Sequence, residues 1–521
     1  MNYSRLALTL AWLSPLASFL IGLGDSPLTD VDEGAFAQAT RELIASDDWL
    51  STTLLGQPRW DKPILIYWLQ ALSVQAFGST PFAFRLPSAL AGIVWAWLVG
   101  AFVARVSDQR RGALAVLTIA CALGPHVISR VSTADALLNA LLAGATLHAY
   151  LFVQDRDRRA LRIAAACVGL GLLAKGPIAL LIPGAAVLLH VGMQRRWLAL
   201  KAMLADPVAW AILIGIAAPW YGWQLAQHGQ AFIDGFILKH NVGRFTQTMH
   251  GFSAGPLYYP AWTLIALLPS VWLLGPMLHQ LIRGPRPAAF SFGLAWFAFV
   301  ILFFTVSATK LPHYGFYGLT GLVIAMAIAR PERIPRLAFV FPVAILVLAA
   351  MWPKLLAMLA PRVNDPFYAA AIPEAISRFD DVWVLSCAFG ALALALIGWV
   401  AASRRRPIAN GEFAWALASI ACMVVLGPGL VGGTVQAIQR PVVEAAERAA
   451  ARRLDVVMWG IDIPSFAVLA ATRVERRDPR PGEIVLTKTR RRAELAKIAP
   501  VDEVIYERAD VSLLKLGKPP E

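Results

Sequence analysis

The chain has 521 residues, of which 58% are hydrophobic and 15% are charged. Soluble proteins carry about 25% charged residues, so this composition excludes an ordinary soluble protein. The formal net charge is +14, but arginines and lysines cluster in short loops between apolar runs, which indicates membrane topology rather than nucleic-acid binding. The four cysteines lie inside apolar runs and indicate neither disulfides nor zinc ligands.

Apolar runs recur along most of the chain, each close to the length that crosses about 30 Å of hydrocarbon as a helix. Because backbone groups in lipid must be satisfied internally, these runs predict an all-α polytopic membrane bundle of about 13 transmembrane helices. Residues 1–24 show no clear signal-peptide cleavage site, so we interpret them as a retained first span. The predicted spans are residues 6–24, 85–104, 112–128, 135–153, 161–174, 177–193, 207–223, 259–281, 288–306, 313–330, 337–353, 382–402 and 413–431.

The basic loops predict the orientation of the bundle. With these spans, every short arginine-rich loop falls on the same side as Arg5, which the positive-inside rule assigns to the cytoplasm. The opposite side receives a first outer loop, 25–84, and a second long outer loop, 224–258, and long loops of this kind are usually functional. The basic loops contain residues 105–111, 156–162, 195–196, 283–286, 330–336 and 404–406.

The composition changes after residue 432, where charge returns and the periodicity becomes that of a soluble domain. We therefore expect a membrane domain over residues 1–432 and a small C-terminal α/β extracytoplasmic domain over residues 433–521. The tail has no P-loop and no dinucleotide fingerprint, so it predicts no nucleotide site. Its predicted elements are an amphipathic helix at 441–453 and strands within 455–460, 483–489 and 502–516.

The first outer loop begins with two acids at a predicted helix start. Thr29 with Asp32, or Asp30 with Glu33, fits a capping pattern for a helix within residues 29–49. In one interpretation, these acids only cap a surface helix. In the other, Asp32 and Glu33 line a site, because a helix N-terminus favours an ionised carboxylate that accepts a proton or orients a hydroxyl.

The stretch GQPRWDKPILIYW, residues 56–68, places an acid and two bases against an apolar segment. The aromatic segment that follows predicts a helix lying in the membrane interface, with Lys62 at the level of the lipid headgroups. Lys62 is then either a snorkelling anchor or a contact to a phosphate group.

Further polar residues enter the predicted outer mouth of the bundle from distant segments. Each alone is consistent with an interfacial anchor, but charges at membrane depth are costly, and together they indicate a site. They are Arg130, Asp135, Lys175, Lys239, His240, Arg244, Lys310, His313 and Tyr314.

Carboxylates and scattered cations at headgroup depth fit transfer from a lipid-linked phosphosugar. The lipid tail of such a donor lies in the bilayer and its phosphate lies at the interface. The cations would stabilise the departing phosphate, and the carboxylates would position or deprotonate the acceptor.

The motifs resemble those of the aminoarabinose transferase family, within the protein O-mannosyltransferase superfamily of GT-C membrane glycosyltransferases. The resemblance runs through most of the chain. It is carried by DEGAFAQATREL, DWLSTTLLGQPRWDKPILIYWLQ, FRLPSAL, SRVSTAD, LAKGP, APWY, HNVGRF, KLPHY and IDIPSF, in that order. It implies a GT-C fold, a periplasmic active site in the bacterial inner membrane, an undecaprenyl-phosphate sugar donor and a lipid A or other envelope acceptor.

The resemblance also implies roles for single residues. It makes Asp32 the catalytic carboxylate, with Glu33 beside it and Asp135 as the second acid of the cavity. Asp61 and His240 are the pair implied to hold a divalent metal, although two ligands without cluster spacing do not by themselves indicate one. The residues expected to bind the donor phosphate are Lys62, Arg244, Lys175, Lys310, Arg59 and Arg85, and Arg130, His313 and Tyr314 complete the cavity.

Other functions remain open at this point. A protein O-glycosyltransferase would use the same donor chemistry. A transporter for a lipid-linked sugar would also place charges in a membrane cavity, but we find no inverted repeat, and the charges gather on one side. A scaffold without chemistry does not explain cations at separate helix ends. The sugar and the acceptor are not identified by these residues.

Overall fold

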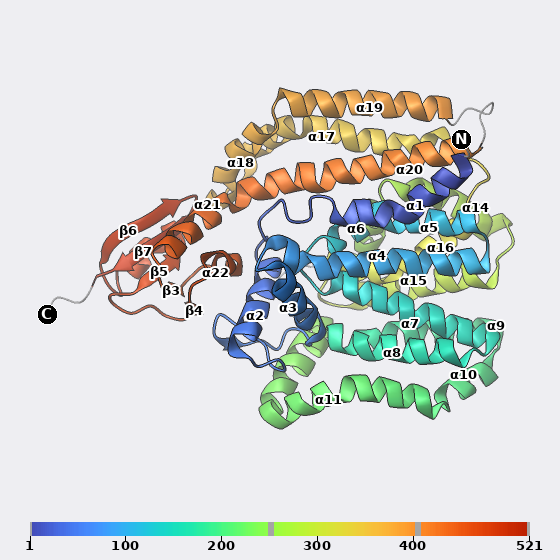
Figure 1. Cartoon of the computed structure of the whole chain (residues 1–521), viewed down its shortest axis with the longest axis horizontal. Coiled ribbons are helices and arrows are strands. Elements are labelled where there is room, and N and C mark those ends of the chain that lie inside the picture. Colours follow the sequence, from blue (N-terminus) through green and yellow to red (C-terminus); the bar gives the residue numbers. More distant parts are fainter. Residues whose placement is uncertain (1–2, 248–254, 402–407, 518–521) are drawn as a thin grey trace.

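A computed structural model describes residues 3–247, 255–401 and 408–517. Figure 1 shows the long helices lying side by side along one direction, with a small sheet at one end and α2 and α3 between the bundle and the sheet. The predicted fold class, a helical membrane bundle with a small C-terminal α/β unit, is confirmed.

Every predicted span overlaps a helix or a broken helix. Within the described residues, seven helices are long and apolar enough to cross a membrane, or up to nine if each bent pair is one span. The chain is thus a multi-pass membrane protein, while the total of about 13 crossings stays a prediction. The first helices are α1 (Tyr3–Leu20), α4 (Pro81–Val106), α5 (Gln109–Cys121), α6 (Leu123–Ser129), α7 (Asp135–Asp155), α8 (Arg158–Lys175), α9 (Ile178–Gln194), α10 (Trp197–Leu204) and α11 (Pro207–Phe232).

The second half of the bundle is less regular. The π-helix η1 (Ile233–Gly243) continues α11 and leads into α12 (Arg244–Thr246), and the 3-10 helix η3 (Pro312–Gly318) leads into α16. The basic loop at 404–406 and residues 248–254 of the second outer loop lie outside the described residues. The remaining helices of this half are α13 (Tyr258–Ala266), α14 (Leu274–Arg283), α15 (Ala288–Val306), α16 (Leu319–Ile328), α17 (Val340–Leu359), α18 (Pro366–Arg378), α19 (Asp381–Ala401) and α20 (Ile408–Val424).

Two of the predicted spans are each broken by a bend, and the two breaks contact each other through the backbone. The pair α5 and α6 bends by 62°, and the pair containing α13 and α14 bends by 112°. The Leu123 N–H at the first break donates to the Leu268 carbonyl at the second, over 2.9 Å. Each break thus satisfies a backbone group that lipid would leave unpaired.

Close packing of α15 on α16 fixes the polar segment between them. A Cβ atom at Gly293 would lie 2.3 Å from the Gly321 carbonyl oxygen, so only glycine allows the two helices to approach this closely. The segment they hold, residues 307–318, carries His313 and Tyr314.

The first outer loop folds into a packed unit. It contains α2 (Asp32–Ser46), the short pair β1 (Thr53–Leu54) and β2 (Gln57–Pro58), and α3 (Leu65–Phe77), which confirms both helices predicted there. Phe36 and Tyr67 pack in one buried cluster with Phe232 and Phe236, so this loop and the second outer segment share a core.

The C-terminal unit is a five-stranded sheet in the order β4-β3-β5-β7-β6, with β3 parallel to its neighbours and β7 antiparallel to its neighbours. The predicted helix and strands are confirmed, and β4, α22 and α23 are additional. A continuous helical run, Gly411–Ala451, crosses residue 432, so the proposed domain boundary falls inside a helix. The elements are α21 (Gly432–Ala451), β3 (Val456–Met458), α22 (Pro464–Ala470), β4 (Val474–Arg476), β5 (Ile484–Thr487), α23 (Arg492–Leu495), β6 (Val501–Arg508) and β7 (Val511–Leu516).

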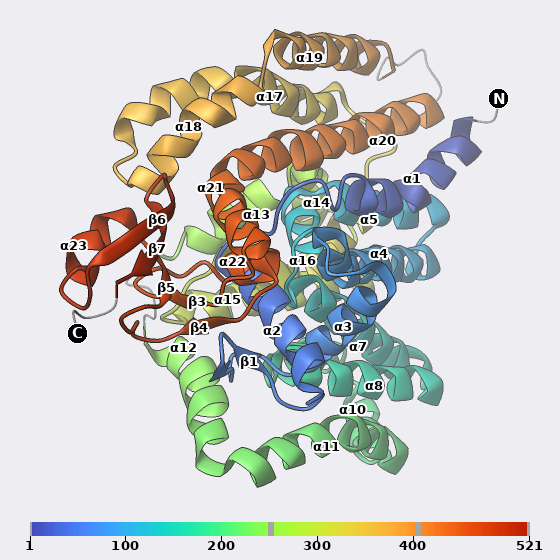
Figure 2. The same ribbon diagram turned by 60° about the vertical axis from the view of Figure 1, so that its left-hand side comes forward.

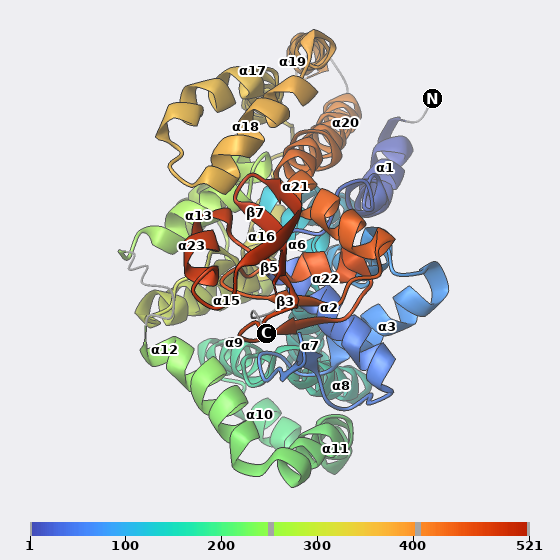
Figure 3. The same cartoon turned by 90° about the vertical axis from the view of Figure 1, so that its left-hand side faces the viewer.

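The C-terminal unit packs directly on the first outer loop. Leu55 of that loop lies in the same core as Val442 and Phe466, and Arg41 donates to the Ala467 carbonyl over 2.6 Å. Figure 3 shows α22 beside α2. The unit therefore covers the end of the bundle at which the predicted site residues gather.

Candidate functional site

The site is centred on Asp61, in the loop between β2 and α3. One Asp61 carboxylate oxygen lies 2.7 Å from His240 Nδ1 and 3.5 Å from Arg244 Nη2, and the other lies 3.5 Å from Arg59 Nη2. Burial alone would raise the pKa of Asp61, but the His240 contact and the charges of Lys62 and Arg59 hold it well below its usual range. An ionised Asp61 thus contacts basic side chains from both outer loops.

Lys62 is a buried cation of this group. Its ammonium donates to the Asp61 carbonyl over 3.0 Å. Burial, opposed by Asp61 and reinforced by the positive charges of Arg244 and Lys175, lowers the pKa of Lys62 to about 7. The repulsion between such closely placed cations decreases when an anion binds among them.

Asp135 and Lys175 meet because of their positions in a helical hairpin. The short loop between α7 and α8 makes these helices antiparallel, so the first residue of α7 and the last residue of α8 lie at the same end. A carboxylate at a helix N-terminus and an ammonium at a C-terminus both complement the helix dipole. Asp135 and Lys175 form a buried ion pair, and Tyr317 Oη lies 2.7 Å from Lys175 Nζ and donates to Asp135 over 3.0 Å.

Residues of η3 complete this wall. His313 Nε2 lies 3.8 Å from the Asp135 carboxylate, and Arg244 Nη1 lies 3.5 Å from the Tyr314 hydroxyl. Tyr317 was not predicted from the sequence. The signal was present in KLPHYGFY, because side chains three residues apart face the same side of a 3-10 helix, as Tyr314 and Tyr317 do.

A cavity of about 390 Å³ is lined by side chains of two kinds. The polar lining is made of Asp61, Lys62, Lys175, His240, Arg244 and Tyr314. The apolar lining includes Leu181 of α9, Phe245 of α12, and Phe303 and Phe304 near the end of α15. The cavity therefore suits an amphiphile with an anionic head and a hydrocarbon chain.

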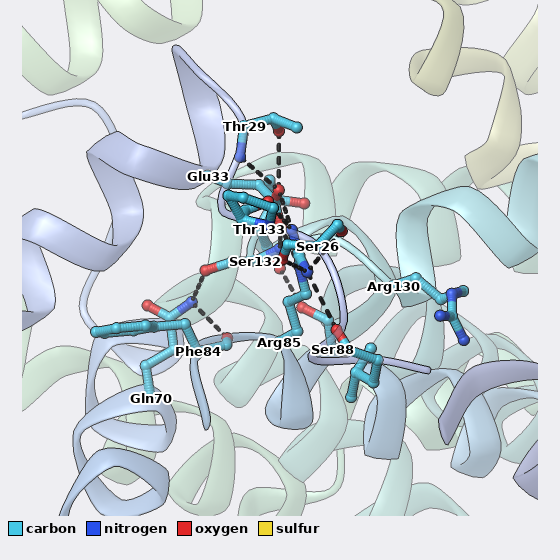
Figure 4. Close-up of polar contacts among 12 residues, drawn as sticks. Ser26, Thr29, Glu33, Gln70, Phe84, Arg85, Ser88, Arg130, Ser132 and Thr133 are labelled. Atoms are coloured by element: carbon cyan, nitrogen blue, oxygen red, sulfur yellow. Dashed lines mark hydrogen bonds and ion pairs between the residues drawn. The ribbon is translucent and has the colours of Figure 1, made fainter. Parts of the chain in front are cut away.

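Glu33 and Arg85 form a separate buried cluster (Figure 4). Arg85 Nε and Nη2 donate to the two Glu33 carboxylate oxygens over 2.7 and 2.8 Å. Glu33 also accepts from the Thr29 hydroxyl and from the Ser132 N–H, and burial, which alone would raise its pKa, is outweighed by Arg85, so the pKa lies below 4.5. The Thr29–Glu33 contact replaces the predicted cap pairs Thr29–Asp32 and Asp30–Glu33, which were wrong.

These internal partners occupy both residues of the ion pair. The other guanidinium N–H groups of Arg85 donate to backbone carbonyls, including those of Leu23 and Pro27. Neither Glu33 nor Arg85 lines the amphiphilic cavity. The predicted catalytic role of Glu33 and phosphate-binding role of Arg85 therefore gain no support from the geometry.

Arg130 and Lys310 hold helix ends. Arg130 donates to the carbonyls of Ser18 and Phe19 at the end of α1 and of Ile21 and Gly22 just beyond it. Lys310 donates to the carbonyls of Thr305 and Ser307 at the end of α15, over 2.8 Å each. Both act as cationic C-terminal caps in this geometry, and neither lines the amphiphilic cavity.

Asp32 differs from its neighbour Glu33. It is the exposed first residue of α2, and its carboxylate has no hydrogen-bond or ion-pair partner within the residues that the structure describes. Burial alone would lower the pKa of Arg59, but Tyr67, Asp61 and, more weakly, the charge of Asp32 raise it, so Asp32 acts on Arg59. Asp32 is thus an available carboxylate at the edge of the site.

The predicted metal pair does not fit a divalent ion. Asp61 and His240 contact each other directly, and Arg59, Lys62 and Arg244 surround Asp61 with positive charge. Across the described part of the chain, no group of three or more His, Cys, Asp or Glu residues is placed to hold a metal. A metal at these two residues would lack further protein ligands and would face three cations.

Several known proteins are similar to this chain. Residues 61–223 match the family model described as dolichyl-phosphate-mannose-protein mannosyltransferase. The chain is 31% identical over 335 residues to an undecaprenyl phosphate-alpha-4-amino-4-deoxy-L-arabinose arabinosyl transferase of Serratia proteamaculans, covering 62% of this chain and 59% of the relative. For the enzyme of the same name from Aeromonas salmonicida, the identity is 32% and the coverages are 58% and 56%. These matches thus span less than two thirds of the relatives' length.

The fold is shared over nearly the whole chain with a solved structure. The crystal structure of ArnT from Cupriavidus metallidurans bound to undecaprenyl phosphate superposes with a TM-score of 0.81 at 18% identity, covering 98% of this chain and 99% of that one. The apo structure gives 0.79. The fold expected from the resemblance to the aminoarabinose transferases is thereby confirmed.

Proposed function

We propose that this chain is an integral membrane glycosyltransferase that moves a sugar from an undecaprenyl-phosphate donor to lipid A or another envelope acceptor. The observation that carries the proposal is the amphiphilic cavity. Its cations suit a phosphate, and its aromatic and aliphatic wall suits a prenyl chain. Leu181 is 40% exposed on α9, which supports entry of that chain from the lipid.

The polar lining of the amphiphilic cavity supports a role for each of its residues in the transfer reaction. The bond between the sugar's anomeric carbon and the phosphate oxygen breaks, and its electron pair stays on the phosphate. Lys62 and Arg244 stabilise that charge, and Asp61, which contacts His240, holds Arg244 in place. The acceptor oxygen bonds to the anomeric carbon, and Asp32 takes the proton when the acceptor is a hydroxyl. A phosphate acceptor is already anionic and needs little base assistance.

The orientation belongs to the same proposal. The described basic loops support a cytoplasmic N-terminus, and Figure 1 places that terminus at the end of the bundle far from the sheet. The C-terminal domain and the amphiphilic cavity are then periplasmic, in the inner membrane of a bacterium.

A protein O-glycosyltransferase is the second candidate, because residues 61–223 match a protein mannosyltransferase model. Mass spectrometry of lipid A, other envelope glycolipids and envelope proteins, from cells with and without the gene, separates the two. A sugar mass lost from a lipid supports the first candidate, and a mass lost only from proteins supports the second. Unchanged envelopes, with no transfer from an undecaprenyl-phosphate-linked sugar in vitro, would contradict both.

The affinity for undecaprenyl phosphate is expected to fall about tenfold between pH 6 and pH 8.5. Burial lowers the pKa of Lys62 to about 7, so the unliganded protein loses this ammonium as pH rises through that value. The charged form binds the phosphate, so affinity is highest below pH 7. Dissociation constants measured in nanodiscs across this range would check it.

The control is Lys62→Arg, because arginine stays charged throughout this range. The phosphate's own second ionisation acts in the opposite direction and is common to both proteins. If the native protein and Lys62→Arg give the same pH profile, Lys62 is an anchor rather than a phosphate ligand.

A further inference from the structure

A second cavity, of about 360 Å³, lies where the C-terminal domain meets the first outer loop. It is enclosed by residues just before α2, by the start of α18, by α21 and by loops of the sheet. Figure 2 shows α18 and the β6–β7 edge on the same side of the molecule, and Arg508 of β6 pairs with Glu374 of α18 over 3.1 Å. The amphiphilic cavity does not share its lining residues.

One wall holds a buried side-chain amide whose oxygen lacks a hydrogen-bond partner within the described residues. Gln439 of α21 is 5% exposed and lines the cavity, and its Oε1 accepts no hydrogen bond within the described residues. Buried polar atoms are normally paired, so an unpaired one facing a cavity indicates a missing donor. Beside it lies Asp30, which accepts from the Ser465 N–H over 2.9 Å and from the Ser465 hydroxyl.

Most charges around the cavity are neutralised internally. Asp365 and Asp510 share Arg490, at 3.3 and 3.2 Å, and Asp462 pairs with Arg476. Three of the four acids that line the cavity therefore have a cationic partner already. The remaining acid is Asp30.

One cation balances that acid. Lys488 lines the cavity, and its ammonium has no hydrogen-bond or ion-pair partner in the part of the chain that the structure describes. Phe367 and Tyr368 add aromatic surface. The cavity thus offers one carboxylate without a cationic partner, one ammonium and one unpaired amide oxygen, which together carry no net charge, beside aromatic rings.

We propose that this cavity binds the hydroxyl groups of an uncharged sugar, and that this sugar belongs to the acceptor. Hydroxyls donate to Gln439 and Asp30 and accept from Lys488, which a phosphate cannot do at all three, because Asp30 repels it. Val31 lines the cavity and Asp32 follows it, with Cα atoms about 3.8 Å apart. The inference rests on the proposed function, because it places the acceptor sugar beside Asp32, which the proposed function makes the base.

Saturation-transfer difference NMR on the full chain in nanodiscs tests this. The probes are methyl α-D-mannopyranoside, methyl α-D-glucopyranoside, N-acetylglucosamine and glucose 6-phosphate. We expect a signal from at least one neutral sugar, at least fivefold above that of glucose 6-phosphate. Signals no larger than those of protein-free nanodiscs, or a preference for the phosphorylated sugar, would overturn the inference.

Two variants locate the binding. Gln439→Leu and Lys488→Ala are each expected to reduce the neutral-sugar signal at least fivefold. Lys497→Ala is the matched control, because Lys497 is an exposed lysine of the same domain that does not line the cavity. Gln439→Met, of nearly equal size and without the amide oxygen, replaces Gln439→Leu if the latter does not fold. Equal signals from native protein and folded variants would place the sugar elsewhere and refute the assignment.

Undecaprenyl phosphate binding to the same samples separates the two proposals. If it binds and the neutral sugars do not, this inference fails and the donor assignment stands. If the sugars bind with the expected variant pattern and undecaprenyl phosphate does not, the donor assignment fails while the sugar site stands.

Discussion

Replacing Asp32 with Asn is expected to reduce sugar transfer to a hydroxyl acceptor by about 10²–10⁴-fold, the usual contribution of a general base. Asp32 is exposed, has no partner in the described residues and lies at the first turn of α2. Asn keeps the size of the side chain and loses the proton acceptor. The measurement is the turnover rate with saturating donor, together with the dissociation constant for undecaprenyl phosphate.

Asp47→Asn is the matched control for this variant. Asp47 lies at the other end of α2 in a left-handed conformation that Asn adopts readily, and its side-chain oxygen accepts from Trp49. Its turnover should remain close to that of the native protein. Near-normal turnover in Asp32→Asn would discard the catalytic assignment, and a loss shared equally by Asp47→Asn would indicate a general effect on α2.

Arg85→Ala is expected to lower the free energy of unfolding by about 3–5 kcal/mol, because it leaves the buried Glu33 carboxylate without its cation. Both side chains are at most 5% exposed, so water does not replace the lost partner. Because the pKa of folded Glu33 is lowered, the native pair contributes fully above pH 4.5 and loses its contribution as pH falls through the folded value. Thermal unfolding in detergent, followed from pH 7 downward, reports both effects.

Arg105→Ala provides the comparison on an exposed ion pair. Arg105 and Asp155 are 55% and 50% exposed, and such pairs contribute about 0–1 kcal/mol. If Arg85→Ala unfolds at the same temperature as Arg105→Ala but loses undecaprenyl phosphate binding, Arg85 binds the donor and its assignment as a structural partner of Glu33 is wrong.

The membrane helices were predictable because the length of each apolar run, and the arginines between the runs, can be read directly from the sequence. The amphipathic period of residues 441–453 and the apolar strands after it likewise carry local signals. The strand β4 was missed because its three residues, Val474–Arg476, show one buried position and two less buried ones. The bend between α5 and α6 depends on a partner backbone near Leu268, which lies far away in the sequence.

The residues that gather at the site were predictable from the sequence, but the partner that each of them holds was not. Lys62, Arg244, Asp61 and His240 do meet, although 178 residues separate the first from His240 in the chain numbering. A sequence cannot distinguish a cation that awaits a ligand from one that already holds a carboxylate or a helix end. Arg85 and Lys310 belong to the second kind, because their partners are fixed by packing rather than by neighbouring residues.

The most direct test is a cryo-electron microscopy structure of the full chain with undecaprenyl phosphate. We predict phosphate density within about 3.2 Å of the Lys62 ammonium or the Arg244 guanidinium, and a prenyl chain along Leu181 and Phe303. A headgroup bound outside this cavity, or a cavity left without lipid at saturating ligand, would contradict the donor assignment.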